Sequence, residues 1–117
     1  MWQLRHIVFH SKGANMQVKL QLEDETLELV LTAHSYQNGR LAIRATEDSG
    51  EAYGTITVNL PNEEIGPDEI FVKTYDANSH WVPALLQSLP DVFKDTGKVV
   101  PCGHAYAEVW KLLKPIA

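Results

Sequence analysis

Cysteine is almost absent from this chain, since Cys102 is the only one in 117 residues. A single cysteine forms no disulfide within the chain, and it builds a structural zinc site only with several histidine or carboxylate ligands beside it. Proteins that depend on disulfides belong to oxidising compartments. The cysteine content therefore favours a reducing compartment, and we expect the protein to be cytoplasmic.

Long apolar runs are missing as well. The sequence has no stretch of about 18 apolar residues, which a membrane-spanning helix needs. It also has no basic segment followed by an apolar one, the pattern of a secretory signal. We therefore expect neither secretion nor a membrane partner.

Basic residues are outnumbered by acidic ones. The chain has 10 lysines and arginines against 15 aspartates and glutamates, a formal net charge of −5 at pH 7. Because proteins bind phosphate backbones by replacing counterions with several basic side chains, we expect no direct nucleic-acid binding. The acidic residues fall mostly between the expected strands, which is typical of a solvated surface; the alternative is an acidic surface that docks on a basic partner.

Motifs of nucleotide or nucleophilic chemistry are also lacking. Neither GxGxxG nor GxxxxGK[ST] occurs, so we expect no cofactor. Cys102 and His104 are the only pair that resembles a nucleophile and a base, because residues two apart on a strand share a face. No nearby residue stands out as an orienting group or an oxyanion site. We therefore expect a protein that is not an enzyme, with catalysis by Cys102 and His104 as the alternative.

Metal-ligand spacing is absent too. His34, His80 and His104, together with Asp76, could converge in space, but no HxH, CxxC or HExxH pattern requires it. We therefore predict no metal site.

The chain does have the composition of a folded domain, with 44% hydrophobic and 21% charged residues. Its length suits one domain with a core of its own. Regular strand patterns begin only after Met16. We therefore expect a single α+β domain over residues 16–117, preceded by residues 1–15 as an N-terminal extension or an edge strand.

The clearest pattern predicts a β-hairpin over Leu41–Leu60. Side chains on a strand alternate between two faces, and here apolar residues alternate with polar ones on both sides of an acidic turn that contains Gly50. The predicted inward residues are Ile43, Ala45, Ile56, Val58 and Leu60. The predicted outward row consists of Tyr53, Thr55, Thr57 and Asn59, with Arg44 and Thr46 across the hairpin.

A second hairpin over residues 17–33 precedes it, and four strands joined by short turns favour an antiparallel meander, because parallel neighbours need long crossovers. Residues 70–72 predict another strand. A helix is expected to start near Ser79 or His80, carry Pro83 in its first turn and end before Pro90.

The C-terminal part is less regular. Residues 91–98 are expected to be a loop or a helical turn, and residues 103–113 fit a strand and a helix equally well. The predicted fold is α+β: an antiparallel β-sheet of about five to six strands, arranged as a meander, with one short helix packed on one face.

The segment YGTITVNLP, Tyr53 to Pro61, resembles a family of small uncharacterised bacterial and phage proteins catalogued as a domain of unknown function. Its members are similar to this chain over roughly residues 17–112, in an LAIRA-like strand, an acidic glycine turn, the TVNLP strand end, an IFVKTYDAN-like strand, a helix and a C-terminal strand. The resemblance implies an α+β fold with a strand at 103–112, and an origin in phages and conjugative elements. The chain departs from the pattern in its first fifteen residues and at His104, where an aromatic residue is usual.

The resemblance also implies accessory functions such as antagonism of host defence, and it provides no catalytic residues. Our hypothesis is a non-enzymatic, protein-binding accessory protein of phage or mobile-element type, an inhibitor of the anti-restriction or anti-CRISPR kind whose partner is a host-defence component. The alternatives are a Cys/His-dependent enzyme and a ligand-binding or structural module.

The predicted interaction surface is the outward row with its neighbour across the hairpin: Tyr53, Thr55, Thr57, Asn59 and Arg44. The alternative for this row is an ordinary solvated sheet face. Trp2, Trp81 and Trp110 are expected to be core residues, and an aromatic residue left exposed would mark an interface. Tyr106 and Trp110 are the candidate exposed pair.

Overall fold

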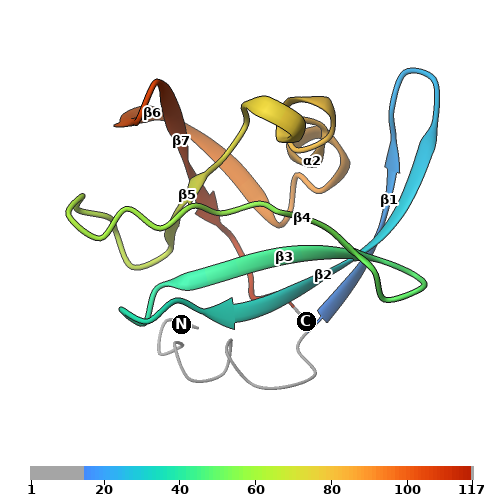
Figure 1. Cartoon of the computed structure of the whole chain (residues 1–117), viewed down its shortest axis with the longest axis horizontal. Coiled ribbons are helices and arrows are strands. Elements are labelled where there is room, and N and C mark those ends of the chain that lie inside the picture. Colours follow the sequence, from blue (N-terminus) through green and yellow to red (C-terminus); the bar gives the residue numbers. More distant parts are fainter. Residues whose placement is uncertain (1–14, 117) are drawn as a thin grey trace.

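The computed structural model describes residues 15–116, which form seven β-strands, one 3₁₀ helix and one short α-helix (Figure 1). In chain order these elements are β1 (Asn15–Gln21), β2 (Thr26–Ser35), β3 (Leu41–Glu47), β4 (Ala52–Thr55), β5 (Glu69–Val72), η2 (Asp76–His80), α2 (Ala84–Ser88), β6 (Phe93–Cys102) and β7 (Ala105–Leu112). The predicted α+β fold, with antiparallel strands and one short helix, is confirmed. The strands form two sheets, of four and of three strands, rather than one.

The N-terminal prediction falls almost entirely outside the described residues. Of the predicted extension or edge strand over residues 1–15, only Asn15 is described, and it begins β1.

Strands β1 to β4 form the predicted antiparallel meander, in the order β1-β2-β3-β4. Alternation explains the first hairpin, since Leu20, Leu29 and Leu31 are buried whereas the polar residues between them are exposed or half-buried. In the turn between β3 and β4, the Gly50 N–H donates to the Glu47 carbonyl oxygen at 2.8 Å, with Gly50 at a φ of 92° that favours glycine.

The last strand of this meander is shorter than its alternating sequence predicts. A bulge between Ala45 and Thr46 shifts the register, and β4 ends at Thr55. The chain then crosses to the second sheet, where the Lys73 N–H donates to the Ile56 carbonyl oxygen at 2.9 Å. Because of this crossing, Ile56 and Thr57 are both buried, and the predicted outward row from Tyr53 to Asn59 is wrong as a continuous solvent-facing row.

Strands β5, β7 and β6 form the second sheet, in that spatial order. The ambiguous segment at 103–113 is a strand, β7. The prediction of a loop or helical turn at 91–98 is wrong, because β6 runs through it. A bulge between Asp95 and Lys98 interrupts the alternation of β6; Gly97 has a φ of 83°, and its N–H donates to Asp95 Oδ1 at 2.9 Å. This bulge explains why the sequence resembles a turn.

The predicted helix ends before Pro90 as expected, but its predicted start near Ser79 or His80 is wrong: η2 begins earlier, at Asp76, and α2 begins only at Ala84. Pro83 is the N-cap of α2, with a φ of −59°, and its missing N–H costs no helical hydrogen bond there. Helix α2 contacts β1 of the first sheet and β6 of the second, and its Leu85 is fully buried. No helix within residues 15–116 is long and apolar enough to cross a membrane.

Asn78, in the middle of η2, connects the two sheets through its side chain. It is 7% exposed, and its Nδ2 donates to the carbonyl oxygens of Thr55 at 2.8 Å and Lys73 at 2.9 Å. Thr55 is the last residue of β4 and Lys73 directly follows β5, so both carbonyls lie where the ladders end. The Asn78 amide therefore pairs two backbone acceptors at the strand ends.

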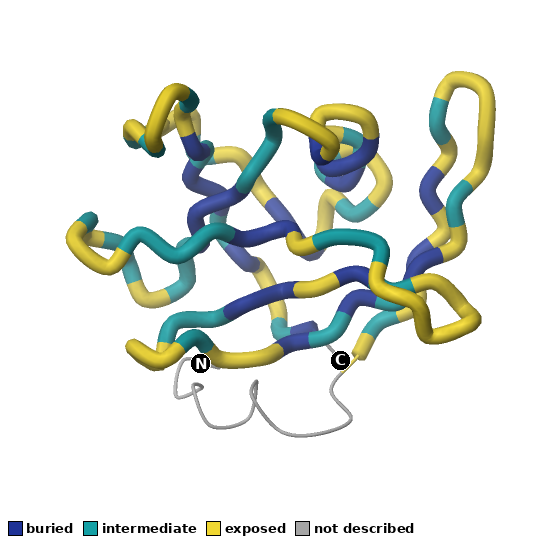
Figure 2. The backbone as a smooth tube through the Cα atoms, in the orientation of Figure 1, coloured by how far each residue is buried: buried dark blue, intermediate teal, exposed yellow. Residues whose placement is uncertain are grey.

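One hydrophobic core joins both sheets and α2 (Figure 2). Trp81 and Trp110 are buried in it, as predicted, whereas Trp2 lies outside the described residues. The largest side chains of this core include Leu20, Leu29, Leu31, Ile43, Ile56, Trp81, Leu85, Phe93, Trp110 and Leu112. A smaller cluster of Phe71, Ala107 and Val109 is covered by Val58, Leu60 and Ile65. Of the predicted inward residues, Ile43, Ala45 and Ile56 belong to the main core, and Val58 and Leu60 to the smaller cluster.

Candidate functional site

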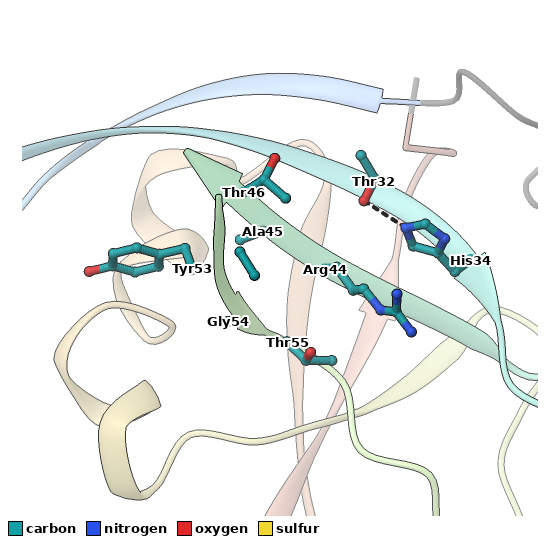
Figure 3. Close-up of a pocket in the computed structure, with 9 residues that line it drawn as sticks. Thr32, His34, Arg44, Ala45, Thr46, Tyr53, Gly54 and Thr55 are labelled. Atoms are coloured by element: carbon teal, nitrogen blue, oxygen red, sulfur yellow. Dashed lines mark hydrogen bonds between the residues drawn. The ribbon is translucent and has the colours of Figure 1, made fainter. Parts of the chain in front are cut away.

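A hollow of about 450 Å³, open to solvent, lies where β2, β3 and β4 run side by side (Figure 3). It is lined by Thr32, His34, Arg44, Ala45, Thr46, Ala52, Tyr53, Gly54 and Thr55. Around the β3–β4 bulge, Ala52 is small and pairs with Thr46, while Ala45 pairs with Gly54 and is buried in the core, so neither Ala45 nor Gly54 has a side chain that fills the space. Concave surfaces with a few convergent polar groups are the usual binding sites of proteins, which makes this hollow the candidate site.

The strand register places Arg44 at the centre of the hollow. It lies directly opposite Thr32 on β2 and opposite Thr55 on β4, so the three side chains share one face of the sheet. Figure 3 shows the guanidinium between the side chains of β2 and Thr55. Arg44 is exposed, and no carboxylate in the described part of the chain forms an ion pair with it.

Beside Arg44, His34 and Thr32 form a hydrogen-bonded pair on β2, with 2.9 Å between Nε2 and Oγ1 (Figure 3). Partial burial lowers the pKa of His34 below its ordinary value, and the Arg44 charge lowers it further. The imidazole is therefore neutral at pH 7. Of the described residues that line the hollow, Arg44 is then the only charged one.

Tyr53 is the extra residue of the bulge and lies at the other end of the hollow, with its ring pointing away from Arg44 (Figure 3). The ring packs edge-on against Trp81, with 5.2 Å between the centroids and 77° between the planes. Burial, together with the charges of Glu25 and Glu47, raises the pKa of the Tyr53 phenol above its ordinary value. Tyr53 is thus held in place by the core and stays neutral.

Of the five predicted interaction residues, the structure brings Arg44, Tyr53 and Thr55 together in the hollow. Thr57 is 4% exposed, and its Oγ1 accepts a hydrogen bond from the Ile43 N–H at 3.0 Å, so it serves the fold. Asn59 lies further along the chain, where its Oδ1 accepts from Asn38 Nδ2 at 3.1 Å.

Sequence reasoning missed Thr32 and His34 as members of this site. Both alternate with the buried Leu31 and Ala33, so their outward direction was visible in the sequence. Their place beside Arg44 depends on the β2–β3 register, which periodicity alone does not give.

Cys102 and His104 do not lie on one face of a single strand. Cys102 ends β6, Gly103 has a φ of 63°, and His104 is exposed in the turn before β7. The Cys102 Sγ lies 3.1 Å from Tyr75 Oη, and this contact, with burial, raises the pKa of Tyr75 to about 12. The shared-face argument holds only within one strand, and here a turn separates the two residues.

The residues considered for a metal site are also dispersed. His34 pairs with Thr32, whereas His80 Nε2 lies 3.0 Å from the Glu25 carboxylate in the β1–β2 turn. Within residues 15–116, no three His, Cys, Asp or Glu side chains form a group that could hold a metal ion.

Among the Phe, Trp and Tyr side chains of residues 15–116, Tyr106 is the one classed as exposed. Tyr106 is 62% exposed and Val99 is 56% exposed, and the β6–β7 register makes them diagonal neighbours on one face. Trp110 is fully buried, so the predicted exposed pair of Tyr106 and Trp110 is wrong for Trp110.

Comparisons with models of protein families, with curated proteins and with solved structures found no match for this chain. The family resemblance of the Tyr53 to Pro61 segment therefore stays a prediction.

Proposed function

We propose that this chain is a non-enzymatic, protein-binding accessory protein that contacts its partner through the outer face of the four-stranded sheet. The observation that carries the proposal is the exposed guanidinium of Arg44, which has no ion-pair partner among residues 15–116 and lies in a hollow lined by threonines. Arginine and tyrosine contribute most to protein–protein affinity when they lie in a pocket at the centre of an interface. Arg44 and Tyr53 are residues of these two types, and both line the hollow.

The surface around the hollow supports the same proposal. Polar side chains of β1 and β2, including Gln17, Lys19 and Glu28, share its face and are exposed. A polar rim around a small central site is the usual anatomy of an interface between proteins that also exist apart.

The family resemblance suggests which partner to test first. It supports a protein of a bacterial host-defence system, bound in the cytoplasm by an accessory protein of phage or mobile-element origin. The alternative without a protein partner is a small-molecule-binding module that uses the same hollow.

Affinity capture with matched variants tests the proposal. The full chain, Arg44→Ala and the control Lys94→Ala serve as baits in bacterial lysates that contain restriction and CRISPR proteins. Lys94 is exposed on β6, in the other sheet, and has no ion-pair partner in the described residues. We expect one stoichiometric partner with the full chain and with Lys94→Ala, and at least tenfold less with Arg44→Ala, the loss expected for a central arginine. Equal recovery with Arg44→Ala, or no stoichiometric partner, would contradict the proposal.

A further inference from the structure

We propose that the hollow binds one carboxylate group of the partner protein, with Arg44 as its counter-charge. This inference rests on the proposed function, because it names the group that the protein partner inserts.

The first argument is that Arg44 is available for a ligand, whereas the other arginine of the described chain is not. The Arg40 guanidinium donates to the carbonyl oxygens of Leu60 at 2.7 Å and Glu63 at 2.8 Å, and it lies over the Phe71 ring at 5.8 Å. Arg40 therefore holds the fold together. Within residues 15–116, Arg44 has neither a hydrogen bond nor an ion pair, so binding a ligand breaks no such contact with the described residues.

The second argument concerns the neutral donors around Arg44. Thr32 and Thr55 flank it in the register, and each hydroxyl has one proton to donate. When His34 carries its proton on Nε2, it donates to Thr32 Oγ1 and leaves the threonine proton free for a ligand. A guanidinium with hydroxyl donors on both sides is suited to the two oxygens of a carboxylate.

The third argument is charge matching. The hollow presents one positive charge, because His34 is neutral and its other lining residues carry no charge at pH 7. The chain as a whole has a formal charge of −5, which disfavours the approach of a multiply charged anion. A carboxylate carries one negative charge, whereas a phosphate monoester carries nearly two at pH 7. The charge balance therefore favours a carboxylate.

Titration of the full, isotopically labelled chain by NMR tests the inference without the partner. Four probes are added at low salt: acetyl-Gly-Glu-Gly-amide, acetyl-Gly-Gly-Gly with a free carboxyl terminus, the uncharged acetyl-Gly-Gln-Gly-amide, and inorganic phosphate. We expect saturable shifts at the Arg44 side-chain N–H and at the amides of Thr32 and Thr55 with at least one carboxylate peptide. The first two probes distinguish a partner's side chain from its C-terminus.

Two substitutions of Arg44 complete the test, with Lys94→Gln as the control. Arg44→Gln should abolish the saturable shifts and keep the spectrum of a folded protein. Arg44→Lys keeps the positive charge but loses the two parallel N–H donors of the guanidinium, so it should bind the carboxylate peptide about tenfold more weakly.

Three outcomes would overturn the inference: no shifts localised to the hollow, equal shifts with the glutamine peptide, or tighter binding of phosphate at the same amides. The capture experiment and the NMR titration distinguish failure of the proposed function from failure of the carboxylate inference. If a partner is captured in an Arg44-dependent manner but no carboxylate probe binds, the proposed protein-binding function stands and the carboxylate inference is rejected. Carboxylate binding without any captured partner would support the site and contradict the proposed function.

Discussion

Gly54 is the residue at which the hollow and the core meet. It lines the hollow on one side, and on the other the Trp81 ring lies so close that a Cβ at position 54 would be 2.9 Å from Trp81 Cζ2. Trp81 is 2% exposed, so its ring has little room to withdraw. Glycine is required here by the close approach of an aromatic ring, and not by an unusual backbone angle.

We therefore expect Gly54→Ala to lower the free energy of unfolding by about 1–3 kcal/mol, the usual cost of an extra methyl group in a packed core. Urea denaturation measures it. The double-mutant cycle with Trp81→Leu identifies the cause, since a shorter side chain leaves space for the new methyl group. In the Trp81→Leu background the cost of Gly54→Ala should fall to less than half. An unchanged cost would show that Trp81 is not responsible.

At the scale of elements, Glu69, the first residue of β5, connects parts of the second sheet through its side chain. Its Oε1 accepts a hydrogen bond from the Gly66 N–H at 3.0 Å, and its Oε2 lies 3.0 Å from Lys98 Nζ on β6. The Gly66 hydrogen bond, followed by Lys98, lowers the pKa of Glu69 below its ordinary value of 4.5. One carboxylate thus links the loop before β5 to the far strand of the sheet.

This link makes stability depend on pH. Because the pKa of Glu69 is lowered in the folded state, its stabilisation is present above the unfolded pKa and is lost as the pH falls through the folded pKa. At pH 7, we expect Glu69→Gln to lower the free energy of unfolding by roughly 1 kcal/mol, a typical value for a charge-assisted hydrogen bond. At a pH below the lowered pKa of Glu69, the carboxyl is protonated and the two proteins should unfold at the same urea concentration.

Glu64→Gln is the matched control for this pH series. Glu64 is exposed in the same loop and has no hydrogen bond or ion pair with the described residues. It should leave the stability unchanged at both pH values within error. A Glu69→Gln effect that is equal at both pH values would contradict the role of the Glu69 charge.

Elements with unbroken alternation were predictable from the sequence, and those with bulges were not. The β1–β2 hairpin follows from the spacing of Leu20, Leu29 and Leu31, because a period of two has one buried face. Strand β6 was not predicted, because the bulge at Gly97 interrupts the alternation of its side chains. Strand β4 was predicted too long, because the chain crosses to the other sheet soon after the bulge at Tyr53. Of the six polar residues that line the hollow, Arg44, Thr46, Tyr53 and Thr55 followed from local alternation, whereas the place of Thr32 and His34 beside them required the register between β2 and β3.

At the scale of the whole molecule, the two sheets share one core, and α2 connects them. Helix α2 contacts β1 and β6, and Leu85 is its one fully buried residue, whereas Leu86 beside it is half-buried. A helix of five residues has little stability of its own, so it owes its position to this burial. Shortening the Leu85 side chain should therefore destabilise both sheets together.

Leu85→Ala is expected to lower the free energy of unfolding by about 2–5 kcal/mol, the range for a buried leucine whose removal leaves a cavity. Leu86→Ala makes the same chemical change on the same helix at a half-buried position, and it should cost less than half as much. Amide hydrogen exchange of the two variants measures where the stability is lost. Because Leu85 lies where α2 meets both sheets, the slowest amides of β2 and β7 should lose protection equally in Leu85→Ala. Loss confined to one sheet would show that the sheets unfold as separate units, in spite of the core they share.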